Sequence, residues 1–133
     1  MEIYDNMESK REHIKASKTW GGEVWFENND LYCGKLLTVY KKMWTSKGLF
    51  HYHPIKDETF FVIEGELLLH IVTKFNFVKP IVLKAGESYR INPSVKHRFT
   101  AINCEKCKFI EVSTKHMEED SIRCEFEGDD PIK

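Results

Sequence analysis

The chain has 133 residues, of which 41% are hydrophobic and 13% aromatic, values typical of one globular domain with its own core. Its 20 basic and 21 acidic residues are intermixed and give a formal net charge of -1, which disfavours nucleic acid as a partner. Residues 1–18 lack the apolar run of a signal peptide, and no stretch reaches membrane-spanning length. We therefore expect a cytoplasmic protein with no membrane partner.

The chain divides into three parts by composition. Residues 1–19 carry closely spaced Lys, Glu and Arg with few apolar anchors, which predicts a short helix or a loose N-terminal arm. Residues 20–126 hold the regular β-rich pattern and should form one barrel. Residues 127–133 are read as a C-terminal tail that follows a closing strand.

Short β-rich segments follow one another from Trp20 onward, separated by turn residues such as Glu64-Gly65 and Asn92-Pro93-Ser94. No helical pattern is long enough for a βαβ unit, so the predicted fold is all-β, an antiparallel jelly-roll barrel. Nine strands are expected, at Glu23–Glu27, Cys33–Trp44, Gly48–Tyr52, Glu58–Ile63, Glu66–Val72, Val78–Leu83, Ser88–Ile91, Lys96–Ile102 and Lys108–Ser113.

The segment from Gly48 to Gly65 carries the strongest chemical signal. Residues two apart in a strand point to the same face, so His51 and His53 should both project into the barrel. Four residues then let the chain turn into the next strand, where Glu58 can return a carboxylate to the same point before a tight turn at Gly65. Three ligands for a metal ion would converge from one short stretch.

A fourth ligand is predicted at His97, which begins a strand after the turn at Asn92-Pro93-Ser94. A single histidine on a strand is more often an ordinary structural residue, but the joint spacing of His51, His53, Glu58 and His97 favours a metal site. Three imidazoles and one carboxylate suit a divalent transition metal, namely Mn, Fe, Co, Ni or Zn, better than Mg or Ca. The pattern does not distinguish among these metals.

Two further features have ordinary structural interpretations. Cys104 and Cys107 form a single CxxC, which we interpret as a hairpin turn carrying two free thiols. His70 lies in an apolar run and is expected to be a packed histidine rather than a fifth ligand.

These motifs resemble the paired motifs of the cupin superfamily, with His51-x-His53, Glu58 and Gly65 in the first and Gly86 and His97 in the second. A wider likeness, over about Trp20 to Arg123, is to the sugar-isomerase branch of cupins, the type II phosphomannose isomerases and D-lyxose isomerase-like proteins. The segments that carry this likeness are Trp20–Trp25, Tyr32–Lys35, His51–Phe60 and Ile110–Thr114 leading to Glu119–Arg123. Phosphomannose isomerases of this type usually have Gln at the position of His51 and Arg at that of Lys56.

The resemblance implies a metal-dependent aldose–ketose isomerase that acts on a small sugar, which could be phosphorylated. In such a reaction the metal binds substrate oxygens and a side chain moves the proton between neighbouring carbons. Strand alternation turns Glu111 inward with Phe109 and Ser113, so Glu111 is the candidate acid or base. By the resemblance, Lys35 and Lys56 lie near the substrate, where an ammonium could bind an oxygen.

Two other functions stay open at this point. A mononuclear iron dioxygenase also uses a three-histidine site with a free coordination position. A noncatalytic cupin that binds a sugar or a metal would show stabilisation by ligand without turnover. A homodimer is expected in each case, because pairing closes exposed sheet edges.

Overall fold

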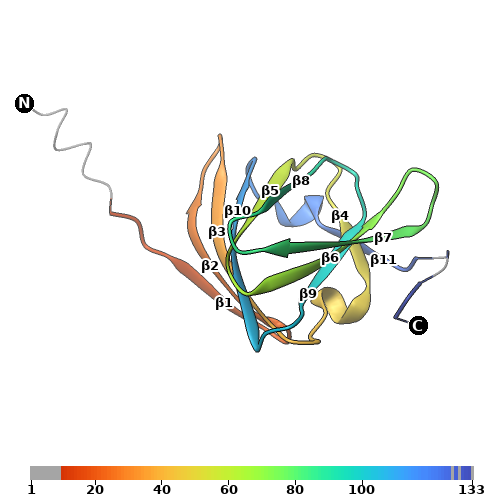
Figure 1. Ribbon diagram of the computed structural model, residues 1–133. Helices are drawn as coiled ribbons and strands as arrows, with labels where there is room; N and C mark the ends of the chain where they lie inside the picture. The colour runs from red at the N-terminus through yellow and green to blue at the C-terminus, as the bar shows by residue number, and fades with distance from the viewer. Residues whose placement is uncertain (1–9, 127, 129, 133) are drawn as a thin grey trace, which may run out of the picture.

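The structure is a computed structural model that describes residues 10–126, 128 and 130–132 (Figure 1). Two short 3-10 turns, η1 (Thr45–Gly48) and η2 (Glu118–Asp120), interrupt a chain of strands. The described residues contain no helix that could cross a membrane. The strands are β1 (Ile14–Lys18), β2 (Gly21–Asn28), β3 (Cys33–Tyr40), β4 (Phe50–Tyr52), β5 (Glu58–Glu64), β6 (Glu66–Val72), β7 (Val78–Lys84), β8 (Ser88–Ile91), β9 (His97–Ala101), β10 (Lys106–Ser113) and β11 (Ile122–Cys124).

The strands form two sheets that face each other, as the jelly-roll prediction requires (Figure 1). One sheet has six strands in the order β1-β2-β3-β10-β5-β8, and the other has five in the order β11-β4-β9-β6-β7. Every strand pair is antiparallel. The all-β jelly-roll fold class is therefore confirmed.

The N-terminal segment differs from the expected helix or loose arm where it is described. Ile14–Lys18 form β1, the edge strand beside β2, with Ala16 opposite Glu23. This strand is held by backbone pairing and its side chains are largely exposed, so no buried alternation marks it in the sequence. Residues 1–9 of the predicted arm, and 127, 129 and 133 of the predicted tail, lie outside the described residues.

Strand β3 ends earlier than the predicted run Cys33–Trp44. Its last residue is Tyr40, and the Met43 backbone N–H donates a 3.1 Å hydrogen bond to the Tyr40 carbonyl across a turn. Lys42 in that turn has a φ of 62°, a left-handed conformation that no strand contains. The chain therefore leaves the six-stranded sheet at this point and reaches β4 through η1.

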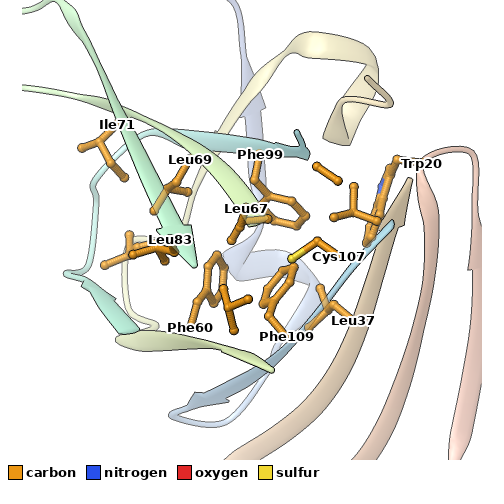
Figure 2. Close-up of a cluster of buried hydrophobic side chains, with 14 residues drawn as sticks. Trp20, Leu37, Phe60, Leu67, Leu69, Ile71, Leu83, Phe99, Cys107 and Phe109 are labelled. Atoms are coloured by element: carbon orange, nitrogen blue, oxygen red, sulfur yellow. The ribbon is translucent and has the colours of Figure 1, made fainter. Parts of the chain in front are cut away.

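The core lies between the two sheets and combines aliphatic side chains with a cluster of aromatic rings (Figure 2). Phe60 of β5, Phe99 of β9 and Phe109 of β10 form a triangle with ring centroids 4.8–5.6 Å apart. Each of the three is at most 3% exposed. Replacing one of these rings by Ala would leave a cavity that the neighbouring side chains cannot fill. The free energy of unfolding should then fall by about 3–5 kcal/mol.

Gly65 makes the abrupt turn from β5 to β6. It has a φ of 81°, and a Cβ atom there would lie 2.6 Å from the Lys106 carbonyl oxygen. Both the backbone conformation and the close approach of β10 therefore require glycine. This is the turn glycine that the first motif predicts.

The side chains on the outer face of β9 are also buried. Arg98 lies on this outer face and does not point into the barrel. Its guanidinium is 0% exposed and forms a bidentate pair with Asp130, at 2.6 and 3.1 Å. It also donates to the Gly48 carbonyl and to His70 Nδ1, and it lies 4.1 Å from the Phe50 ring centroid. His70 is thus a packed histidine, as expected, and it accepts a hydrogen bond from the buried Arg98 guanidinium.

The pH dependence of folding should reveal His70. Burial, and then the charge of Arg98, lower the pKa of His70 from 6.5 to about 4. Between these two values the unfolded chain binds a proton at His70 that the folded protein does not bind, so stability falls as the pH drops through this window. Urea unfolding measured at pH 6.5 and at pH 4.5 gives the free energy of unfolding at each pH. This free energy should fall less between the two pH values in His70→Gln than in the unsubstituted protein.

The exposed His13 offers a matched control for that measurement. His13→Gln should show the same pH dependence as the unsubstituted protein, because the His13 side chain lies at the surface. An unchanged slope in His70→Gln would show that His70 is not held neutral by the fold.

Candidate metal centre

The three histidines of the predicted site converge at the end of β4 and β9. His51 lies in β4 directly opposite His97, the first residue of β9, and His53 follows two residues after His51 on the same side. One ligand nitrogen from each ring lies within 4.8 Å of the others. The sequence therefore predicts this convergence correctly.

Glu58, the first residue of β5, brings its carboxylate to the same point from the opposite sheet. Its Oε2 lies 3.3 Å from Nε2 of His53 and 3.3 Å from Nε2 of His97. Its side chain is 3% exposed. All four residues of the predicted ligand set are thus gathered in one place.

Backbone carbonyls fix the orientation of two of the imidazoles. His53 Nδ1 lies 3.1 Å from the Asp120 carbonyl, and His97 Nδ1 lies 2.9 Å from the Val95 carbonyl. A carbonyl can only accept, so each Nδ1 must carry a proton, and in the neutral ring Nε2 then keeps its lone pair. These lone pairs face Glu58, which is the arrangement of metal-binding histidines.

Several polar atoms at this point have no hydrogen-bond partner among the described residues. They are His51 Nδ1, Glu58 Oε2 and His97 Nε2, and all three are buried. Leaving such atoms unpaired in a protein interior is costly, and native structures rarely do so without a reason. Because nitrogen and carboxylate oxygen are the donors that divalent transition metals take, the residues fit such an ion.

The charge states also suit metal binding. Burial, and then the neighbouring His97, lower the pKa of His51 well below its ordinary value. Burial alone would raise the pKa of Glu58, but hydrogen bonds and positive charge from His53 and His97 in their protonated forms outweigh it and hold that pKa well below the ordinary value. A neutral imidazole and an ionised carboxylate are the forms that bind a metal.

A second cluster of ionisable side chains lies in the same pocket. Lys56 Nζ is 3.2 Å from Glu111 Oε2 and 2.7 Å from His116 Nδ1. Ser113 Oγ lies 3.1 Å from Glu111 Oε2 and 2.9 Å from the Thr114 carbonyl, and its one proton can be donated to either. Strand alternation thus turns Glu111 inward as predicted, and the Lys56 ammonium is the direct charged partner of its carboxylate.

Lys35 joins this cluster from β3, where it lies opposite Glu111 of β10. Its Nζ is 3.2 Å from His116 Nδ1, 3.7 Å from Glu23 Oε1 and 4.1 Å from the Trp25 ring centroid. The Lys35 side chain is only 5% exposed. Both predicted lysines are therefore buried in the pocket rather than solvated on the surface.

The environment shifts the pKa values of the central pair. Burial, and then the charge of Glu58, raise the pKa of Glu111, against the opposing effect of Lys56 and Lys35. Burial would lower the pKa of Lys56, but Glu111 and Glu58 outweigh it and raise that pKa. A carboxylate with a raised pKa is better matched to proton transfer near neutral pH.

Both clusters open into one pocket that is walled by aromatic rings and rimmed by charged side chains. The rings are Trp20, Trp25, Phe60 and Phe99, and the rim includes Lys18, Glu118 and Arg123. A concave surface that combines apolar walls with a few convergent polar groups is the usual form of a small-molecule site.

Three residues of this site were not found by sequence reasoning. His116 and Glu118 come from the loop after β10, and Asp120 uses its carboxylate to accept the backbone N–H groups of Ile55 and Lys56, both at 2.9 Å. A histidine in a polar loop carries no spacing signal. Only its placement beside Lys35 and Lys56 in the fold identifies His116.

Other residues lie outside the site. Arg90 is exposed and pairs with Asp57 at 2.6 Å. Cys104 and Cys107 are free thiols, as expected, the first in the connection from β9 to β10 and the second in β10. The hairpin interpretation is wrong, because β9 and β10 belong to different sheets and do not pair with each other.

Several solved structures share this fold, whereas no curated protein sequence matches the chain. PAC13 from Streptomyces, in complex with uridine, has 10% sequence identity and a TM-score of 0.70 over 89% of this chain and 88% of its own. CapF of Staphylococcus aureus, a capsular polysaccharide assembling protein, has 13% identity and a TM-score of 0.74 over 86% of this chain and 34% of its own. Oxalate decarboxylase of Bacillus subtilis has 13% identity and a TM-score of 0.73 over 86% of this chain and 31% of its own.

At such low identity these structures establish the shared barrel and not a shared activity. The family is shown by a separate match, in which residues 39–113, more than half of the chain, fit the model of the Cupin domain. This span includes His51, His53, Glu58 and His97. The chain is therefore a member of the cupin family.

Proposed function

We propose that this cupin is a metal-dependent aldose–ketose isomerase whose substrate is a small sugar. The observation that carries the proposal is the presence, in one pocket, of a donor set that fits a metal and a buried acid–base pair, Glu111 with Lys56. Isomerisation of a sugar can use both, because the metal polarises a carbonyl while the acid–base pair moves a proton to the adjacent carbon.

His51, His53, Glu58 and His97 would hold the ion, which is Mn, Fe, Co, Ni or Zn by the nature of its donors. When bound there, a divalent ion supplies Lewis acidity toward substrate oxygens. The carbonyls of Asp120 and Val95 keep the rings of His53 and His97 in the required orientation. The site is thus held by the fold before any ligand arrives.

Glu111 is the proposed catalytic base and acid. Its carboxylate lines the pocket and has a raised pKa, and Lys56 holds one of its oxygens, Oε2. The other oxygen, Oε1, is therefore the better placed to accept a proton from one substrate carbon and return it to the next. Lys56 also keeps the carboxylate anchored while its charge changes.

The walls of the pocket suit a polyhydroxylated ligand. Ring faces pack against the C–H face of a sugar, and the lysines and glutamates can bind its hydroxyls. A structure of PAC13, which shares this fold, contains uridine, a polar small molecule. That likeness supports a polar small molecule as the ligand, and the choice of reaction rests on Glu111 and the donor set.

Removing one imidazole should abolish metal binding. Elemental analysis of the purified protein should find about one transition-metal ion per chain, and His51→Ala and His97→Ala should each lose it. His13→Ala, at an exposed site, is the matched control and should keep the metal. A chain that takes up no metal even after reconstitution would contradict the proposed centre, and stoichiometric iron with oxygen uptake but no sugar turnover would favour a dioxygenase.

Removing the base should abolish turnover without removing the metal. Glu111→Gln keeps the shape of the side chain but cannot take a proton, so isomerisation of the active sugar should fall by about 100-fold or more. The screen should cover pentoses, hexoses and their phosphates, with product identified by chromatography.

Glu105→Gln, in the exposed turn before β10, is the control and should retain full activity. If Glu111→Gln turned over as fast as the unsubstituted enzyme, Glu111 would not be the base. If no sugar were isomerised although ligands stabilised the protein, the noncatalytic function would be favoured.

The same proposal includes a homodimer. The outer face of the six-stranded sheet exposes Phe26, Phe61, Ile63 and Val112, each at least 37% exposed. Apolar side chains grouped on a sheet face favour burial against a second copy. Light scattering on the purified protein should give twice the mass of the 15.7 kDa chain, and a purely monomeric protein at high concentration would contradict it.

A further inference from the structure

Two buried ammonium groups converge on a single nitrogen atom in the pocket. Lys56 Nζ is 2.7 Å and Lys35 Nζ is 3.2 Å from His116 Nδ1, and their side chains are 2% and 5% exposed. Two like charges this close in a poorly solvated place repel each other unless negative charge lies near both.

That balancing charge is uneven. Lys56 has a direct partner in Glu111, at 3.2 Å. Among the described residues Lys35 forms an ion pair with Glu23, but Glu23 Oε1 lies 3.7 Å away and already accepts a 2.6 Å hydrogen bond from Trp25 Nε1. Glu111 and Glu118 also attract Lys35, but through charge at longer range and without a direct hydrogen bond to it. An ammonium has three N–H donors. Among the described residues the Lys35 ammonium makes one hydrogen bond, to an acceptor that it shares with Lys56, and it also lies 4.1 Å from the Trp25 ring centroid. Lys35 therefore has unused donor capacity at the pocket wall.

His116 does not supply the missing charge. Because its Nδ1 accepts from the lysines, its proton must be on Nε2, which faces Glu118 Oε1 at 3.0 Å. Burial, and then the charges of Lys35 and Lys56, lower the pKa of His116 and favour this neutral ring. His116 is thus a neutral acceptor between two cations.

The cluster is also fixed before any ligand binds. The His116 backbone N–H donates to Asn28 Oδ1 at 2.9 Å, and Asn28 Nδ2 donates to the His116 carbonyl at 3.3 Å. The ring packs on Trp25, with centroids 4.7 Å apart. The side chains cannot easily turn away to find other partners, so the unused donors of Lys35 stay directed at the pocket that His51 and His53 also line.

We propose that Lys35, with Lys56 beside it, forms an anion-binding subsite, so that the substrate carries a phosphate or carboxylate group as well as the reacting carbons. The inference rests on the proposed function only in calling this ligand a substrate. An anionic oxygen accepts hydrogen bonds from Lys35 and lies between the two ammonium groups. The neutral His116 keeps those groups at a fixed separation and adds no charge of its own.

Simple anions test the subsite without knowledge of the substrate. Metal-free protein, dialysed to remove the chelator, is melted in rising inorganic phosphate, in rising acetate, and in sodium chloride at the same ionic strength. Phosphate or acetate should raise the Tm above the chloride series, and Lys35→Met should weaken the apparent affinity at least tenfold. Lys35→Arg should retain binding, and Lys41→Met, at an exposed site, should behave as the unsubstituted protein.

The anion that raises the Tm more identifies the group that the subsite binds. A larger effect of phosphate indicates a sugar phosphate, and a larger effect of acetate indicates a sugar acid. No stabilisation of the unsubstituted protein beyond chloride, or equal affinity in Lys35→Met, would overturn the subsite. If Lys35→Met does not fold, the NMR signals of the His116 ring decide, because added phosphate should shift them and leave those of the exposed His13 in place.

The outcomes separate this inference from the proposed function. Isomerisation of a neutral sugar by a protein that binds neither anion would retain the isomerase and overturn the subsite. Anion binding lost in Lys35→Met, without turnover of any sugar, sugar phosphate or sugar acid, would retain the subsite and overturn the isomerase.

Discussion

The interior of the barrel is built from inward-facing side chains that change from apolar to ionisable toward the same end of adjacent strands. Antiparallel pairing sets this arrangement, because it places Lys35 opposite Glu111 and His51 opposite His97. The apolar end fills the core shown in Figure 2, and the ionisable end lines the pocket. The inward residues, in strand order, are Lys35, Leu37 and Val39 in β3, Glu58, Phe60 and Val62 in β5, His97, Phe99 and Ala101 in β9, and Cys107, Phe109 and Glu111 in β10.

Placing so many ionisable groups in one interior is costly unless they satisfy one another. Glu111 is held by Lys56, and the outward nitrogens of His53 and His97 are held by backbone carbonyls. The atoms left over, including His97 Nε2, face a common point. The hydrogen bonds that stabilise the pocket therefore leave these atoms without partners, and a ligand that binds here would satisfy them.

The site residues on strands and in the short segment between β4 and β5 could be predicted from the sequence, and those in the loop after β10 could not. Alternation by two residues gives the inward direction of His51 and Glu111 directly, since it depends only on local backbone geometry. His116 reaches the pocket because Asn28, 88 residues earlier, fixes its backbone, and no local pattern encodes that contact. Strand β1 was missed for a related reason, as its pairing leaves its side chains in solvent.

Strand β9 connects the stability of the barrel to the geometry of the site. All five of its residues are buried, with His97 and Phe99 facing inward and Arg98 and Thr100 outward. The outward pair is tied to the segment before β4, because Arg98 donates to the Gly48 carbonyl and Thr100 Oγ1 to that of Met43. A strand fixed on both faces cannot shift to suit an ion, so the position of His97 is set by the fold, and a ligand must fit the geometry that the barrel presents.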